Sequence, residues 1–494
     1  MKRALIIIIS ALTVVFSSFG QAESDTLKYP EYMASQSLPL LSIRTEGLQP
    51  ILSKQKDSAL VAKMNVTIPK DYTSFNRKEP EPLSGIALTI RGRGNATWQG
   101  RMKPYKIKLD KKQELAGLPE HKHFALLPHA GYLNYMSGWG GLEVARMFAG
   151  WWVPRVEPVE LAVNGEYRGR YYLTESVKIS RNRLNIFEQP DLCVDPDTIP
   201  YGWLVEIDNH PDSATSFTIE EYPDMDLTVT YHVPELLSRP QRQWVENEFI
   251  RINEAIYRGD DSWTELIDPV SAARYFIIRE LFWDPDGYSG SMYLHRDMGP
   301  DARWHFGPMW DIAGTHKDKD SWVHESNRHY DTHWFPKLLE SAAFRSELET
   351  QFAELYARKA EIPAIMERIT RFCYMSHYQN YFRWGYPTVS LTIVNDGEHY
   401  GRVLTRNLKW MNNAIAELCG LNAPGLAPML QIEGAMVRLP ATAAKEITVR
   451  VLTPAGKTAA AFTLRPGGIH RLDYLTPGVY VLSAKGLAPV KILL

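Results

Sequence analysis

The chain has 494 residues, of which 45% are hydrophobic and 23% are charged, with 32 Gly, 32 Pro and three Cys. These proportions are those of an ordinary globular protein, and they exclude a disordered, collagen-like or disulfide-stapled chain. The 55 Lys and Arg against 57 Asp and Glu give a net charge of −2, which argues against nucleic acid or an anionic membrane as a general partner. The length allows about two to four domains.

Residues 1–22 have the pattern of a secretory signal peptide. The basic pair Lys2-Arg3 precedes an apolar run over 4–16, and Gly20-Gln21-Ala22 offers small residues before a cleavage site. The run is shorter than the ~20 residues that a membrane-spanning helix needs. We therefore expect an exported protein, at the outer surface or extracellular, with the periplasm as the alternative. No transmembrane segment is expected after removal of the signal. The other interpretation is an uncleaved anchor.

The apolar pattern changes from strand-like to helical along the chain. Over about 38–210, short alternating runs such as 86–90 and 105–109 predict strands, and Asn164-Gly165 predicts a tight hairpin turn within 159–173. One helix is predicted in this half, at 142–150. Over about 234–421 the period is helical, and the predicted helices are 272–282, 344–358 and 403–418, the last ended by Gly420.

Two further segments differ from these patterns. Residues 284–319 are rich in Gly and Asp, too broken for a helix and too polar for a core strand, so we predict a loop that carries a functional site. After a linker at 422–428, strand-length runs at 446–452, 478–483 and 489–493 alternate with turns. They predict a small β-sandwich over 425–494.

A basic turn and strand form the first candidate site. Arg91-Gly-Arg93-Gly-Asn95 combines guanidinium groups with glycines that let backbone N–H groups approach an anion, and Lys103, Lys106 and Lys108 follow. Lys106 and Lys108 project from one face of a strand. Phosphate binding requires such a combination of positive side chains and accessible backbone N–H groups. The alternative is a solvated turn with charged strand faces.

Two aspartates on separate loops form the second candidate site. Asp286 follows a helix in a Gly-rich stretch, and Asp311 ends a short apolar segment 25 residues later. This arrangement resembles the division of labour in phosphoryl transfer, in which one carboxylate aligns the acceptor and another holds Mg²⁺. For Asp284, beside Pro285, the alternative is an Asx-turn that stops the helix.

Other acidic and histidine side chains have weaker patterns. Glu175 ends one predicted strand and could pair a phosphate-binding lysine, while Glu206 or Asp208 ends another and could join a metal site. The alternative for each is an edge carboxylate. His329 and His333 have helical spacing that suits a metal, but the zincin pattern His-Glu-x-x-His is absent, which favours a polar surface loop.

The order of these motifs resembles the CotH kinase family over about 38–421. The motifs are the Arg-Gly-Arg-Gly-Asn turn with its lysine strand, the Asn-Gly hairpin that ends in Glu175, the Glu280-Leu stretch with Asp286, and Gly307-Pro-Met-Trp-Asp311. The resemblance implies an α+β fold like that of an atypical, bilobal protein kinase, with a β-rich first half and a mainly helical second half. It also implies ATP, Mg²⁺ or Mn²⁺, and a protein substrate.

The resemblance assigns roles to the candidates. Asp286 matches the catalytic-loop aspartate and Asp311 the metal-binding aspartate. The nucleotide-binding candidates are Arg91, Arg93, Asn95, Lys103, Lys106, Lys108 and Glu175. After Asp311 the sequence departs from the family, because Ile312 and Ala313 stand where an aromatic residue and a second Asp or Asn are usual.

The C-terminal segment resembles the sorting domain of type IX secretion cargo, through Leu475-Thr-Pro-Gly478 and a Lys491-containing last strand. The resemblance implies passage through an outer membrane, after which the domain is removed or anchored at the surface. The predicted organisation is thus a signal peptide at 1–22, a kinase-like domain at 23–424 and a sandwich at 425–494.

Three functions fit the sequence. The first is an exported protein kinase that phosphorylates Ser or Thr of an unidentified protein. The second is a non-catalytic surface or matrix protein that keeps the fold as a scaffold, which export favours because ATP is scarce outside the cytoplasm. The third, a glycan-binding or glycan-hydrolysing protein, rests only on the aromatic content, with 14 Trp and 25 Tyr, and on the predicted export.

Overall fold

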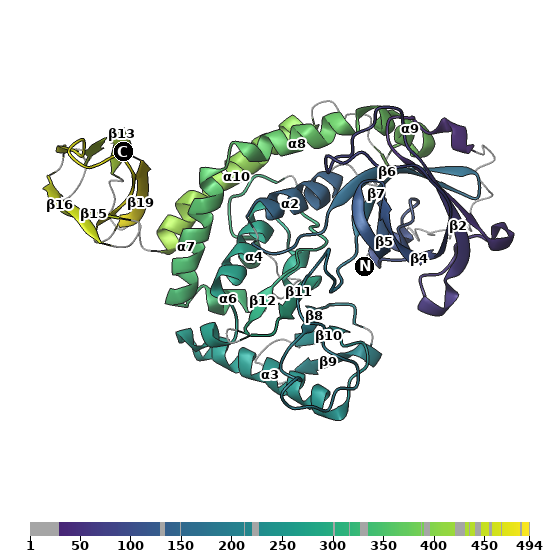
Figure 1. Cartoon of the computed structure of the whole chain (residues 1–494), viewed down its shortest axis with the longest axis horizontal. Coiled ribbons are helices and arrows are strands. Elements are labelled where there is room, and N and C mark those ends of the chain that lie inside the picture. The colour runs from purple at the N-terminus through teal and green to yellow at the C-terminus, as the bar shows by residue number, and fades with distance from the viewer. Residues whose placement is uncertain are drawn as a thin grey trace, which may run out of the picture.

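The computed structural model describes most of the chain (Figure 1). The described residues are 29–128, 134–148, 150–211, 213–219, 227–299, 302–315, 317–326, 334–386, 388–389, 396–419, 430–433, 435–439, 446–453, 457–465, 467–484 and 487–493. The predicted signal peptide, Gly420, the linker at 422–428, and His329 and His333 lie outside them.

Seven strands of the first half form a closed barrel in the order β1-β2-β3-β4-β5-β7-β6 (Figure 1). Their bounds are β1 (Leu40–Thr45), β2 (Leu60–Thr67), β3 (Leu83–Gly92), β4 (Tyr105–Leu115), β5 (Leu118–Pro128), β6 (Val156–Val163) and β7 (Glu166–Glu175). The parallel pairing of β1 with β6 closes the barrel, and the other neighbours are antiparallel. Apolar side chains that alternate along β2, β3 and β4, such as Met64, Ile90 and Ile107, lie in a common core.

The predicted hairpin is confirmed between β6 and β7. Asn164 and Gly165 have φ values of 55° and 81°, so both central residues adopt the left-handed conformation that a two-residue turn of this kind requires. The predicted strands at 86–90 and 105–109 lie within β3 and β4. Local pattern was therefore sufficient for this part of the barrel.

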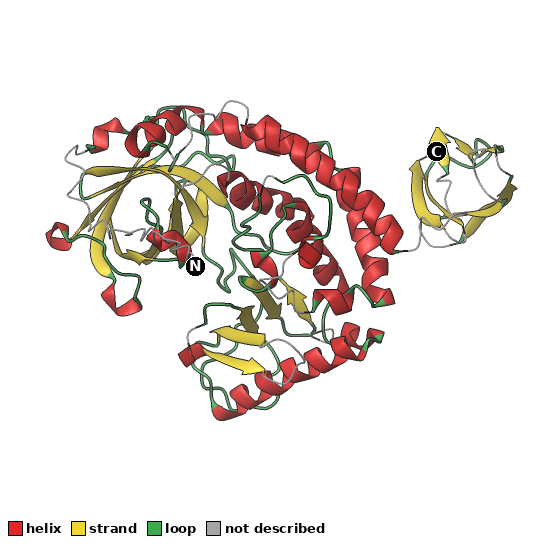
Figure 2. Cartoon of the chain, turned by 180° about the vertical axis from the view of Figure 1, so that it is seen from behind, coloured by secondary structure: helices red, strands yellow, loops and turns green. Residues whose placement is uncertain are grey.

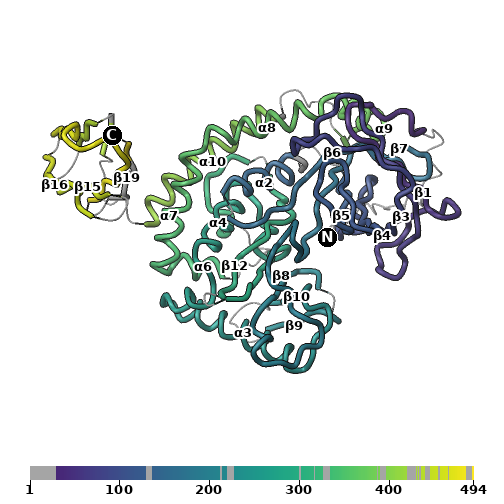
Figure 3. The backbone as a smooth tube through the Cα atoms, in the orientation of Figure 1, coloured from purple at the N-terminus to yellow at the C-terminus, as the bar shows by residue number. Residues whose placement is uncertain are grey.

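A second, antiparallel sheet has the order β12-β11-β8-β10-β9. Its strands are β8 (Trp203–Ile207), β9 (Ser216–Ile219), β10 (Leu227–Val233), β11 (Met292–Arg296) and β12 (Trp304–Phe306). The prediction that 284–319 has no core strand was wrong, because β11 and β12 lie in it and are mostly buried. Figure 3 shows β8 and β10 between the barrel and α3 (Arg239–Arg258).

Helices make up most of the second half and cover this sheet (Figure 2). The other α-helices are α1 (Ala96–Gln99), α2 (Asn134–Phe148), α4 (Pro269–Leu281), α5 (Val323–Ser326), α6 (Phe335–Leu338), α7 (Ala342–Ala357), α8 (Glu361–Phe372), α9 (Tyr374–Trp384) and α10 (Asp396–Leu418). Short 3-10 helices are η1 (Glu31–Met33), η2 (Glu46–Leu48), η3 (Lys56–Ser58), η4 (Ser213–Thr215), η5 (Asp261–Glu265) and η6 (Asp286–Tyr288). The four predicted helices correspond to α2, α4, α7 and α10.

Helix α4 lies at the centre of the helical body. It begins where Asp268 accepts a hydrogen bond from the backbone N–H of Ser271 at 2.7 Å, with Pro269 in the first turn. Apolar side chains on several of its sides, including Phe276 and Ile277, are buried in the largest core, which also contains residues of α3 and the five-stranded sheet. The end of α4 is therefore a rigid position from which the next loop begins.

The C-terminal strands form two small sheets. One has the order β13-β14-β17 and the other β16-β15-β18-β19. Their bounds are β13 (Gln431–Glu433), β14 (Met436–Arg438), β15 (Ile447–Leu452), β16 (Thr458–Leu464), β17 (Ile469–Arg471), β18 (Val479–Ala484) and β19 (Leu487–Leu493). Residues of both sheets share one apolar core, which includes Val437, Val449 and Leu482. Among the described helices, none is long and apolar enough to cross a membrane.

Candidate functional site

The end of β3 and the turn that follows it make contacts of three kinds. Arg91 donates hydrogen bonds to the backbone carbonyls of Lys54 and Gly92. Asn95 accepts a hydrogen bond from the Lys54 ammonium at 2.8 Å. The guanidinium of Arg93 lies 5.2 Å from the ring centre of Trp310. Because Trp310 immediately precedes Asp311, the basic turn reaches the predicted metal-binding loop.

The three candidate lysines have different surroundings. Lys103 donates to the carbonyl of Trp98 at 2.6 Å, with its ammonium 5.2 Å from the centre of the Trp98 ring. Lys108 is exposed on β4. Lys106 is half-buried, and its pKa falls to about 8, first because of burial and then because Lys178, Arg91, Arg93 and Lys56 are positively charged neighbours. We call these five side chains the basic cluster.

The predicted partner of Glu175 is different in the structure. Glu175 is fully buried at the end of β7, where it accepts a hydrogen bond from the backbone N–H of Arg155 at 2.8 Å and pairs with the Arg155 guanidinium at 3.5 Å. Burial raises the pKa of Glu175, and these contacts oppose the rise. The structure thus pairs Glu175 with an arginine rather than with one of the three candidate lysines.

Asp286 and Asp311 both lie close enough to Asp284 to influence its pKa. Asp284 is fully buried and forms an ion pair with Arg279. Burial raises the pKa of Asp284, Arg279 opposes this, and the negative charges of Asp286 and Asp311 raise it again. Asp286 begins η6 and Asp311 has a left-handed backbone with φ of 48°, and both side chains are exposed. The two predicted aspartates therefore both lie near the buried ion pair of Asp284 and Arg279.

Glu206 lies on β8, next to β11, and Asp208 directly follows β8. Glu206 pairs with the His232 imidazole, whose Nε2 lies 2.7 Å from a carboxylate oxygen, and it also accepts a hydrogen bond from Tyr293. Burial raises the pKa of Asp208, and the charge of Glu206 adds to this effect. In the described residues, no group of three or more His, Cys, Asp or Glu side chains is arranged to hold a metal ion.

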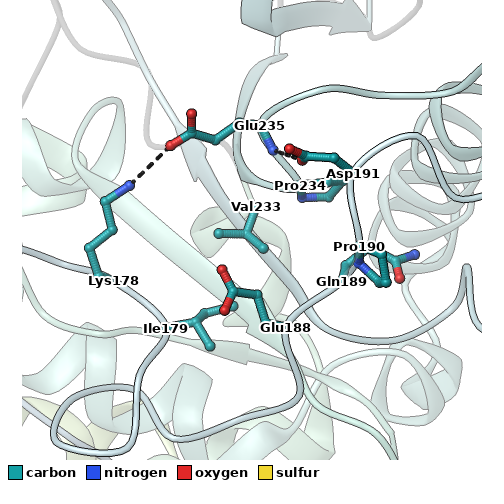
Figure 4. Close-up of a pocket in the computed structure, with 9 residues that line it drawn as sticks. All are labelled: Lys178, Ile179, Glu188, Gln189, Pro190, Asp191, Val233, Pro234 and Glu235. Atoms are coloured by element: carbon teal, nitrogen blue, oxygen red, sulfur yellow. Dashed lines mark hydrogen bonds and ion pairs between the residues drawn. The ribbon is translucent and has the colours of Figure 1, made fainter.

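A cavity of about 380 Å³ opens between the segment after β7 and the end of β10 (Figure 4). It is lined by Lys178, Ile179, Glu188, Gln189, Pro190, Asp191, Val233, Pro234 and Glu235. Lys178 pairs with Glu235 at 3.5 Å, and Asp191 accepts a hydrogen bond from the backbone N–H of Glu235 at 2.8 Å. The volume lies in the range of small-molecule sites.

One apolar cluster joins the cavity to the aspartate loops. Ile179 and Val233 line the cavity and belong to the same buried cluster as Trp310 and Tyr293. Lys178 belongs both to the cavity and to the basic cluster. The cavity, the basic cluster and the loop of Trp310 and Asp311 thus adjoin one apolar cluster, whose residues come from both the barrel and the five-stranded sheet.

Comparison with known proteins identifies the family. The sequence model described as CotH kinase protein matches residues 90–395, which is more than half of the chain. The chain belongs to the CotH kinase family. No curated protein matches it. The CotH match begins in β3 and includes every candidate site residue from Arg91 to Asp311, and it ends before the C-terminal sheets.

Several side chains of this candidate site could not be recognised from sequence motifs. Lys56 and Lys178 lie in segments without a Gly-rich pattern, and Arg279 is one of two arginines on a predicted helix. The sequence did contain one signal for a buried ion pair, because Arg279 and Asp284 lie only five positions apart around the end of α4. A charged residue that is spaced to face a core is a candidate for a buried pair.

Proposed function

We propose that this CotH family member is an atypical protein kinase, which transfers the γ-phosphate of ATP to Ser or Thr of a protein. The main support is that Arg93 of the basic cluster lies over Trp310, which precedes Asp311, and that Asp311 and Asp286 both lie near Asp284. Positive groups for phosphates and carboxylates for metal and proton transfer are the parts that phosphoryl transfer requires.

Nucleotide phosphates are assigned to the basic cluster. Lys106 is the best candidate for direct contact, because Lys103 is directed to Trp98 while Lys106 faces four other cations. Glu235 pairs with Lys178 and Lys56, and a phosphate would offset the repulsion that Lys106 shares with Arg91 and Arg93. The adjoining cavity lies where the rest of the nucleotide would bind, with Lys178 at its border.

A divalent cation fits the aspartates. Mg²⁺ prefers oxygen ligands and is commonly held by one or two carboxylates together with substrate phosphates, so a cage of three protein ligands is not required. Asp311 is the principal candidate ligand for Mg²⁺ or Mn²⁺, with Asp286 nearby. The ion would offset the charge of the phosphates. Asp286 then orients the acceptor hydroxyl and takes its proton on a carboxylate oxygen.

A non-catalytic scaffold is the second candidate function. The observation that favours it is the segment from Ile312 to Thr315, which follows Asp311 without supplying another carboxylate. Purified protein starting at residue 23, incubated with labelled ATP and Mg²⁺ or Mn²⁺, separates the two functions. Transfer of label supports the kinase, whereas the absence of nucleotide binding in calorimetry contradicts it.

We expect Lys106→Met to weaken ATP binding about 10- to 100-fold, the value of a hydrogen bond between charged groups. Lys111→Met is the matched control, because Lys111 is an exposed lysine on the same strand and is not a nucleotide-binding candidate. ATP affinity of the wild type should also fall as the pH rises from 7 to 9, since the Lys106 ammonium loses its proton near pH 8. Lys106→Arg should remove this pH dependence. Equal effects of the two Met variants in calorimetry would contradict the assignment.

Export and surface location are part of the proposal and rest on the sequence patterns. The signal peptide at 1–22 is expected to be cleaved after Ala22, and residues 425–494 to act as the sorting domain. N-terminal sequencing of the secreted protein should begin at Glu23. A mature protein that retains Met1 would contradict cleavage.

A further inference from the structure

Arg279, near the end of α4, contacts both turns that carry the exposed aspartates. Its side chain is fully buried and its guanidinium forms the ion pair with Asp284. It also donates to the backbone carbonyls of Trp310 at 2.9 Å, Asp311 at 3.3 Å and Ser291 at 3.4 Å. One side chain thus binds three segments.

The backbone beside these contacts is unusual. Trp283, Ser291 and Asp311 have φ values of 52°, 54° and 48°. A left-handed backbone is unfavourable for residues other than Gly and persists where the surroundings hold it. Arg279 binds the carbonyls of Ser291 and Asp311, and it pairs with Asp284, the residue after Trp283. The guanidinium is therefore in place to hold all three conformations.

The turn that contains Asp286 lies directly against Arg279. A Cβ atom added at Gly287 would lie 2.2 Å from the Arg279 Nε, so a side chain at this position would displace the turn or the arginine. Because Arg279 is buried with its partners on several sides, it has little room to move. Close packing at Gly287 thus couples Asp286 to the same guanidinium that binds the Asp311 loop.

We propose that Arg279 is a positioning residue that sets Asp286 and Asp311 relative to one another by binding the backbone of both turns; its role in phosphoryl transfer rests on the proposed function. The planar guanidinium presents five donors in a fixed fork, whereas a lysine ammonium is a single centre. A lysine at 279 could keep the pair with Asp284 but could not also reach the carbonyls of both turns.

The test compares Arg279→Lys with Arg170→Lys in the full chain. Arg170 is the matched control, because it is also fully buried, and it donates to the carbonyl of Cys373 at 3.0 Å, on the side of the barrel that faces α9. Amide hydrogen exchange should become at least ~10-fold faster in both 284–291 and 310–315 in Arg279→Lys. Arg170→Lys should leave these two segments as in the wild type.

Gly287→Ala is a second variant that keeps Arg279 and moves the turn away from it. It should also raise exchange over 284–291. The proposal is overturned if Arg279→Lys leaves either turn as protected as in the wild type, or if Arg170→Lys raises exchange there equally. These hydrogen-exchange measurements need no nucleotide, so they still test the role of Arg279 if the protein proves not to be a kinase.

The functional consequence is a separate measurement. If the wild type transfers phosphate, Arg279→Lys should lower kcat about 10- to 100-fold, as loss of a supporting partner commonly does, with the KM for ATP near the wild-type value. A wild type with both turns protected but without nucleotide binding would count against the kinase function and leave the role of Arg279 standing. An unchanged kcat in an active enzyme would overturn the role in transfer.

Discussion

Asp286→Asn is expected to lower the rate of phosphoryl transfer about 10²- to 10⁴-fold, the usual contribution of a positioned general base. Asn has nearly the same shape as Asp but cannot accept the proton of the acceptor hydroxyl. Asp286 is exposed at the first position of η6, so the substitution should leave the fold intact. The measurement is transfer of label from ATP to protein, with ATP affinity determined in parallel by calorimetry.

Two comparisons make this result specific. Asp320→Asn changes another exposed aspartate, one that pairs with Lys317 at 3.6 Å, and transfer should remain at the wild-type rate. Asp311→Asn should instead weaken the dependence on Mg²⁺ or Mn²⁺, because its carboxylate is assigned to the metal. Full activity of Asp286→Asn would show that a different group takes the proton.

Lys319→Met is expected to have the largest effect on stability, about 3–5 kcal/mol in the free energy of unfolding. Lys319 is buried between the rings of Trp283, Trp322 and Trp410, with its ammonium 4.8, 5.4 and 5.0 Å from their centres. There it pairs with the fully buried Glu280. Removal of one partner leaves a charge without its counter-ion in the core.

Glu280 joins the end of α4 to two other segments. Besides Lys319, it accepts hydrogen bonds from the Tyr288 hydroxyl at 2.9 Å and the backbone N–H of Val323 at 2.8 Å, and His324 Nδ1 lies at 3.0 Å. Burial raises the pKa of Glu280, but Lys319 and His324 outweigh it and lower the pKa to about 2. Burial lowers the pKa of Lys319, so the folded environment disfavours its charged form. The pair is therefore stabilised mainly through the contacts of the Glu280 carboxylate.

The control for this prediction is Lys317→Met. Lys317 also lies over the Trp283 ring, at 4.2 Å, but its side chain is half exposed and pairs with an exposed aspartate. Exposed pairs contribute about 0–1 kcal/mol, so Lys317→Met should change stability little. Denaturant unfolding at pH 7 compares the two variants. Equal losses would contradict the importance of the buried pair.

The stability of the wild type should also depend on pH in a defined window. The pKa of Glu280 falls from its ordinary value of 4.5 to about 2 in the folded protein, so the unfolded state binds its proton first as the pH falls. The stabilisation is fully present above about pH 4.5 and is lost toward pH 2. The difference between wild type and Lys319→Met should therefore shrink across this interval. A constant difference would show that the contacts of Glu280 are not its source.

The local pattern of the sequence determined much of the fold. Strands β3 and β4, the hairpin of β6 and β7, and helices α2, α4, α7 and α10 follow from apolar period and turn residues, because these act within a few positions along the chain. Strands β11 and β12 could not be recognised in this way. They are short, and β11 becomes a core strand through its pairing with β8, which lies more than 80 positions earlier.

For the site, the sequence by itself determined the kinds of chemistry: a basic turn and strand, two aspartates on separate loops, and an order of motifs that the CotH match confirmed. Only the tertiary structure decided which groups act together. It placed Lys106 rather than Lys103 among other cations, paired Glu175 with Arg155, and brought Asp286 and Asp311 to one buried guanidinium. Burial and the field of distant charges set these properties, and neither is encoded in the residues adjacent along the chain.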